Sequence, residues 1–135
     1  MKVFSRDNLT WIEMAYATDD SGGYSSYRVE IVTDLKHSRF SAVNLDLHFL
    51  NMAAFAAKLS TFLAGHPSEA MLLGTYDTFI RVRGSPDKAM LEYRLGSSFY
   101  DNPGARDFAM TGSFALDEPN VKRLLKFAEE HKVDV

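Results

Sequence analysis

The sequence predicts a single α+β domain, residues 1–135, in which a curved antiparallel sheet of about six to eight strands is covered on one face by two helices. A protein of 135 residues with 46% hydrophobic residues can bury one sizeable core. Most of the sequence is made of short runs rich in aromatic and β-branched residues, separated by turn residues, which indicates strands. Apolar residues recur at helical spacing at about residues 51–64 and 118–131. The pattern is also compatible with a sheet that closes into a barrel.

The first 50 residues are expected to contribute three strands. Residues 9–18 and 24–33 have strand composition, and the segment TDDSGGYSS between them has the acids, glycines and serines of a hairpin connection. The stretch FSAVNLDLHFL then alternates strictly between apolar and polar residues, which predicts a half-buried strand. The apolar positions, expected in the core, are Val43, Leu45, Leu47 and Phe49. The polar positions, expected to face water, are Asn44, Asp46 and His48.

The two helices are predicted from their apolar stripes and end signals. The Asn51 side chain is expected to cap the first helix, and Gly65 to end it in the left-handed conformation. The stripe of this helix contains Met52, Phe55, Ala56, Leu59, Phe62 and Leu63. Asp117 is expected to cap the second helix, with Pro119 in its first turn. The stripe of this second helix contains Val121, Leu124, Leu125 and Ala128.

Four further strands are expected at about residues 70–75, 78–84, 89–96 and 108–116. The turn Ser85-Pro86-Asp87-Lys88 places proline where its fixed φ suits a type I turn, so the middle two strands should form a hairpin. Symmetric pairing about this turn fixes a register that matches apolar with apolar residues. The expected pairs are Phe79–Arg94, Ile80–Tyr93, Arg81–Glu92, Val82–Leu91 and Arg83–Met90.

Three arginines on one face of this hairpin raise the question of anion binding. Arg81 should meet Glu92, whereas Arg83 and Arg94 are expected to have no acid opposite them. Arg94 is also expected to contact the ring of Phe79. We interpret the face mainly as a solvated sheet surface, since exposed charge pairs are common and weak. The alternative is a small anionic-ligand or nucleic-acid site formed by Arg81, Arg83 and Arg94.

Residue types that carry catalysis are sparse in this sequence. There is no cysteine, the four histidines are scattered, and no glycine or serine motif matches a phosphate loop or a nucleophile elbow. Only Asp46 and His48 share a strand face at close spacing, which does not make a metal site. An enzyme would need a pocket assembled from distant residues, such as Asp46, His48 and Tyr76. We therefore expect no enzyme, no metal and no cofactor.

Charge and hydropathy limit the partners and the location. The net charge of -3 is spread evenly, with seven acids and five bases in residues 1–50 and again in residues 101–135. A nucleic-acid-binding module usually carries a clustered positive face, so nucleic acid is not the expected partner. No apolar run is long enough to span a membrane, and acids interrupt the N-terminal segment where a signal peptide would need an apolar run. We expect a cytoplasmic protein.

The segment SSFYDNPGAR is the best sequence candidate for a partner-binding surface. It places Phe99 and Tyr100 beside the turn-forming run Asp101-Asn-Pro-Gly. Aromatic residues at a loop tip commonly anchor a protein partner, so Phe99, Tyr100 and Asp101 are predicted to bind one. The alternative is that the two aromatics fold back over the sheet. Long strands such as residues 9–18 also leave a homodimer open, through pairing of sheet edges.

The order of elements over residues 40–131 resembles the WapI-type family of small bacterial immunity proteins and their uncharacterised relatives. The resemblance lies in FSAVNLDLHFLNMAAFAAKLSTFL, EAMLLGTYDTFIRVRG, KAMLEYRLGSSF and FAMTGSFALDEPNVKRLLKFAEEH. These are mainly apolar and turn positions, and they carry over no catalytic residue. The resemblance implies a non-enzymatic protein that binds and neutralises a bacterial toxin domain. Residues 1–40 show no specific match.

Overall fold

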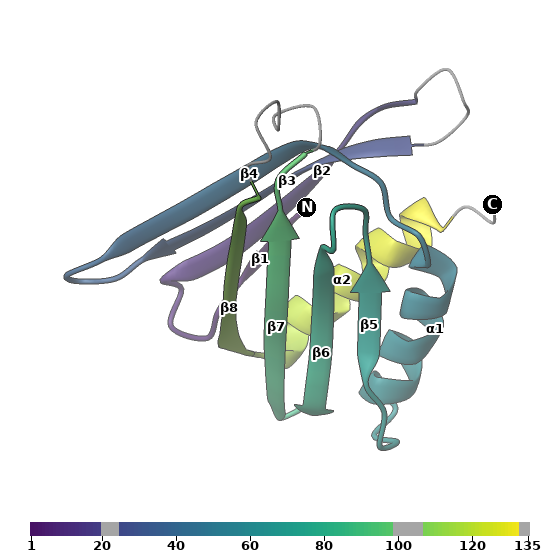
Figure 1. Ribbon diagram of the computed structural model, residues 1–135. Coiled ribbons are helices and arrows are strands. Elements are labelled where there is room, and N and C mark those ends of the chain that lie inside the picture. Colours follow the sequence, from purple (N-terminus) through teal and green to yellow (C-terminus); the bar gives the residue numbers. More distant parts are fainter. Residues whose placement is uncertain (20–24, 99–106, 133–135) are drawn as a thin grey trace.

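The computed structural model describes residues 1–19, 25–98 and 107–132 (Figure 1). Its strands form two four-stranded antiparallel sheets, each with its strands in sequence order. The first sheet contains β1 (Lys2–Phe4), β2 (Thr10–Asp19), β3 (Ser25–Asp34) and β4 (Arg39–Leu47). The second contains β5 (Ala70–Leu73), β6 (Phe79–Ser85), β7 (Lys88–Gly96) and β8 (Ala109–Leu116). Helix α1 (Met52–Leu63) connects the sheets, and α2 (Glu118–His131) follows β8.

The predicted α+β class is confirmed, but the prediction of one curved sheet is wrong. The polypeptide leaves the first sheet at β4, forms α1 and then starts a separate sheet at β5. Figure 1 shows the strands of the first sheet running across those of the second. Contacts between the two sheets in the described residues include a bridge between Phe49 and Gly74 and the Asn44 side chain, whose Nδ2 donates to the Gly96 carbonyl at 2.7 Å. The Arg6 amide also donates to the Ala115 carbonyl at 2.9 Å. These contacts hold the sheets together without a ladder between them.

Both helices and both sheets bury apolar side chains in one core. Helix α1 packs on α2 and β5, and α2 also contacts β1. The predicted helix positions are confirmed, as is the cap by Asp117, whose Oδ1 accepts from the Asn120 amide at 3.0 Å. Gly65 has the predicted left-handed backbone, with φ of 87°. Within the described residues, neither helix has the length and apolar character needed to cross a membrane.

The predicted cap by Asn51 is wrong. Its side chain makes no capping hydrogen bond to α1 and instead bonds the neighbouring strand β5. Asn51 Nδ2 donates to the Met71 carbonyl at 2.9 Å, and Oδ1 accepts from the Leu73 amide at 2.7 Å. These two bonds satisfy backbone groups of β5, an edge strand, which explains why an asparagine stands at this junction.

The predicted faces of β4 are also wrong over part of the strand. Asn44 is 4% exposed, whereas Val43 and Leu45 are 50% and 66% exposed. The register against β3 shifts between the pairs Val29–Asn44 and Tyr27–Leu47, which marks a β-bulge. Because the extra residue reverses the alternation, Asn44 and Leu47 both point inward although they are three positions apart.

The predicted register of the β6–β7 hairpin is confirmed at all five pairs, including Ile80–Tyr93 and Arg81–Glu92. Ser85 pairs with Lys88, so Pro86 and Asp87 form the turn between them. The apolar side chains Ile80, Val82, Leu91 and Tyr93 are buried, as expected for the inner face. The opposite face carries the arginines and Glu92.

Candidate functional site

The arginines on the outer face of the β6–β7 hairpin are paired within the protein. Arg81 Nη1 donates to Glu92 at 3.2 Å, and Arg81 Nε lies 3.0 Å from Glu69 as an ion pair without hydrogen-bond alignment. Arg83 also pairs with Glu92, so the expectation that it lacks an acid is wrong. Glu92 stands diagonally across the two strands from Arg83, within reach of a long side chain, so matching of directly opposite residues does not reveal this ion pair. The cation over the ring of Phe79 is Arg81, at 5.6 Å, rather than Arg94.

Arg94 stabilises the turn between β5 and β6. Its Nη1 donates to the carbonyls of Tyr76 and Asp77, at 3.3 and 3.2 Å. Both of these residues are in the left-handed region, with φ of 60° and 56°, which is unusual for residues with side chains. All three arginines of the predicted anion site therefore already contact carboxylates or carbonyls, and a ligand would have to compete with those contacts.

The structure brings together Asp46, His48 and Tyr76, the residues considered as a distant catalytic set. The Tyr76 hydroxyl donates to Asp46 Oδ2 at 2.8 Å, and His48 Nε2 lies 3.5 Å from Asp46 Oδ1. His48 Nδ1 lies 3.0 Å from the Ser25 carbonyl. Both ring nitrogens thus face acceptors of the protein, so neither is presented to a substrate as a general base. The cluster ties the end of β4 to β3 and to the β5–β6 turn. Among the described residues, no three potential metal ligands gather in one place.

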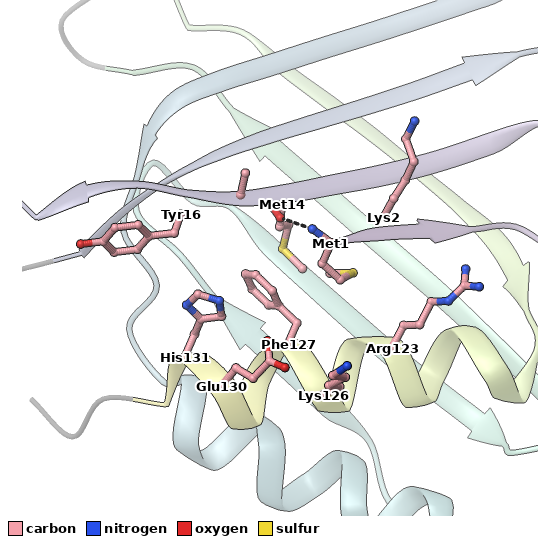
Figure 2. Close-up of a pocket in the computed structure, with 10 residues that line it drawn as sticks. Met1, Lys2, Met14, Tyr16, Arg123, Lys126, Phe127, Glu130 and His131 are labelled. Carbon is pink, nitrogen blue, oxygen red and sulfur yellow. Dashed lines mark hydrogen bonds between the residues drawn. The ribbon is translucent and has the colours of Figure 1, made fainter.

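The predicted partner-binding residues Phe99, Tyr100 and Asp101 lie outside the described residues. Within the described part of the protein, another feature has the form of a binding site. A cavity of about 580 Å³ lies between α2 on one side and the start of β1 with the middle of β2 on the other. Figure 2 shows its lining side chains. We refer to it as the α2–β2 pocket.

The floor of the α2–β2 pocket is apolar. Met14 from β2 is fully buried, and Phe127 from α2 is 5% exposed. Met1 lies beside Met14, and the backbones of these two residues exchange hydrogen bonds of 2.9 Å in both directions. Figure 2 shows the thioether groups of Met1 and Met14, from the strands, close to the Phe127 ring, from α2. Thioethers and an aromatic ring form an adaptable surface that accepts apolar groups of different shapes.

One end of the pocket is aromatic. The His131 ring packs against Phe127 with centroids 4.3 Å apart and a tilt of 35° between the planes. It lies closer to parallel with Tyr16, at 6.3 Å and 22°. His131 Nδ1 lies 3.3 Å from the hydroxyl of buried Tyr27, which fixes the ring in place. Tyr16 also contacts the Tyr27 ring edge to face at 5.9 Å, and it remains 45% exposed. Its exposed part forms the edge of the pocket on the aromatic end.

The rim of the pocket along α2 is charged. Arg123, Lys126 and Glu130 line the cavity from successive turns of the helix. The ion pairs of α2 in the described part of the protein are Glu118–Lys122 and Glu129–Lys132, so none neutralises Arg123 or Lys126. Lys2 also lines the pocket, but its ammonium group lies over the rings of Trp11 and Phe4, and Figure 2 shows it directed away from the floor.

Sequence reasoning missed this pocket because its walls are far apart in the sequence. Met14 and Tyr16 had been identified only as strand residues, and Phe127 had been left out of the predicted helix stripe. The short strand β1, which brings Met1 to Met14, was not predicted. The one local signal is the spacing of Phe127 and His131, four positions apart on one face of a helix.

Comparison of the sequence and structure with models of protein families, with curated proteins and with solved structures finds no match. Function is therefore inferred from the pocket and from the sequence pattern. The pocket offers an apolar floor, a tyrosine at its edge and two basic side chains on its rim.

Proposed function

We propose that this protein is a non-enzymatic binding protein that holds a protein partner at the α2–β2 pocket. The observation that carries the proposal is the pocket itself, a hollow of about 580 Å³ whose floor is Met14 and Phe127 and whose edge is the exposed Tyr16. This volume is in the range of sites that enclose a side chain or a small molecule. Aromatic and methionine side chains are also enriched in the centres of protein interfaces.

The chemistry of the pocket favours binding over catalysis. Its histidine, His131, packs against Phe127 and lies within hydrogen-bond distance of Tyr27. Among the described residues that line it, the acid is Glu130, on the rim. A catalytic site requires a base and a second group that converge on a reacting atom. Here the groups that converge are apolar, and they would contribute affinity rather than proton transfer.

The sequence resemblance to immunity proteins suggests which kind of partner to expect. On that basis we propose a bacterial toxin domain, bound in the cytoplasm and neutralised by the complex. The net charge of -3 supports steering toward a basic partner at long range. Phe99, Tyr100 and Asp101 remain candidates for a second contact with the same partner. Binding of a small anion or nucleic acid by Arg81, Arg83 and Arg94 remains an alternative. Such a ligand would have to displace Glu92 from Arg81 and Arg83, and the Tyr76 carbonyl from Arg94.

The proposal is tested by comparing what the tagged protein and two variants capture from an extract of its native cell. Tyr16→Ala removes the exposed edge of the pocket, and Phe40→Ala removes a side chain that is 60% exposed and does not line it. We expect the wild type and Phe40→Ala to retain the same protein at low and at moderate salt, and Tyr16→Ala to lose it. Equal retention by Tyr16→Ala would contradict the proposal. Nucleic acid retained only at low salt would support the arginine alternative.

A further inference from the structure

The charges on α2 give the α2–β2 pocket two unlike ends. Arg123 and Lys126 line it toward the middle of the helix, whereas Glu130 lines it close to the C-terminal end at His131. Arg123 and Lys126 are three positions apart, a spacing that places their side chains on the same face of a helix. Figure 2 shows Arg123 at one end of the cavity and Tyr16 with His131 at the other, with the apolar floor between them.

The charges on α2 favour an anion at the Arg123 end. The carbonyl groups at the C-terminus of a helix carry partial negative charge, and Glu130 adds a full negative charge close to that end. An anion would therefore be repelled from the Tyr16–His131 end and attracted by Arg123 and Lys126. The guanidinium group of Arg123 already makes one hydrogen bond, to Asn120 Oδ1 at 3.3 Å, which orients it and leaves other N–H groups for a ligand.

From these features we infer that the pocket selects an aromatic or long apolar group that carries a carboxylate, held with its ring against Tyr16 and His131 and its carboxylate at Arg123 and Lys126. This inference rests on the proposed function and specifies the chemistry of the partner group. The rise along the helix axis from Arg123 to His131 is about 12 Å, which is an upper limit for the distance between the carboxylate and the ring, because the side chains of both residues reach into the cavity. A phenylalanine or leucine side chain of the partner meets this description when it stands next to an aspartate, a glutamate or the partner's terminal carboxylate.

Methionine methyl NMR can locate binding in this pocket, because the protein has six methionines and only Met1 and Met14 line the cavity. The probes are phenylpropanoate, phenylpropanol and phenylpropylamine, which share a ring and a linker but end in an anion, a neutral group and a cation. Each is titrated to about 10 mM, since molecules of this size bind weakly. Met71 and Met90, on the second sheet, serve as internal references.

We expect phenylpropanoate to shift the Met14 signal and to bind about three- to tenfold more tightly than phenylpropanol, with phenylpropylamine weakest. The double variant Arg123→Gln/Lys126→Gln should lose this preference. Lys122→Gln is the matched control, because Lys122 lies on the same helix, pairs with Glu118 and does not line the pocket. This control should keep the preference, and added salt should weaken phenylpropanoate alone.

Three results would overturn the inference. Equal binding of phenylpropanoate and phenylpropanol at Met14 would show an apolar pocket without selection for an anion. A preference that survives in Arg123→Gln/Lys126→Gln would place the anion elsewhere. Absence of a Met14 shift with every probe would exclude this class of ligand. None of these results would refute the proposed function, which fails separately if Tyr16→Ala retains the captured partner.

Discussion

Replacing Gly96 with alanine should destabilise the protein strongly, because the backbone of the β5–β6 turn occupies the space of the new methyl group. A Cβ atom at position 96 would lie 2.0 Å from the Tyr76 carbonyl oxygen. That oxygen accepts from Arg94, while the Gly96 amide donates to Thr78 and the Gly96 carbonyl accepts from Asn44. Neither partner in the clash can move away without breaking a hydrogen bond.

The cost of this substitution has two parts. Overpacking of a well-packed site costs about 1 to 3 kcal/mol, and loss of one hydrogen bond adds about 1 kcal/mol, so the free energy of unfolding should fall by about 2 to 4 kcal/mol. At about 4 °C per kcal/mol for a protein of this size, the melting temperature should fall by roughly 8 to 16 °C. Gly74→Ala is the matched control at the same turn, since its Cβ would find its nearest neighbour at 3.3 Å. Equal melting temperatures for the two variants would refute the reasoning.

Three further substitutions test other parts of the fold. Asn51→Ala should lower the free energy of unfolding in urea by about 1 to 3 kcal/mol, because two backbone groups of β5 lose their partner; an unchanged midpoint would contradict this role. Arg83→Gln should change the free energy of unfolding by less than about 1 kcal/mol, since the Arg83 side chain that pairs with Glu92 is exposed. A larger loss of stability would contradict the view that this ion pair is weak. Burial raises the pKa of the Tyr93 hydroxyl above its ordinary 10.0. The contribution of the neutral hydroxyl to the free energy of unfolding is therefore complete below pH 10 and is lost as the pH rises through the higher pKa of the folded state. Tyr93→Phe should accordingly unfold less readily in alkali than the wild type, and equal alkaline unfolding of the two would contradict the shift.

The parts of the fold that were predicted correctly depend on local signals. The β6–β7 register followed from one turn and from matching apolar residues across it, as Ile80 and Tyr93 show. The second helix followed from a cap, Asp117, and a proline in the first turn. Each signal lies within a few residues of the structure that it specifies, so one sequence is enough to interpret it.

The incorrect predictions concern contacts between residues far apart in the sequence. The bulge in β4 reverses which side chains are buried, and strict alternation of residue types cannot reveal an extra residue. Asn51 resembles a helix cap in sequence, but its partners, Met71 and Leu73, are in β5 beyond the far end of α1. The division into two sheets likewise depends on how the segment after α1 pairs, which no local pattern specifies.

The candidate site was harder to predict from the sequence than the fold. Met14 and Phe127 meet in the pocket although they stand near opposite ends of the sequence, and neither belongs to a recognisable motif. The arginine pattern was recognised, but the acid that pairs with Arg83 stands diagonally across the strands rather than opposite. Phe99, Tyr100 and Asp101 lie outside the described residues, so their predicted role in binding stays a prediction.

The most direct test of the proposed binding site is a methionine methyl NMR titration with the purified protein partner recovered in the capture experiment. If the partner occupies the α2–β2 pocket, the Met14 signal should shift or broaden on addition of the partner, while the Met90 signal on the second sheet should stay unchanged. An unchanged Met14 signal in a complex that forms fully would contradict the assignment of this pocket as the partner-binding site.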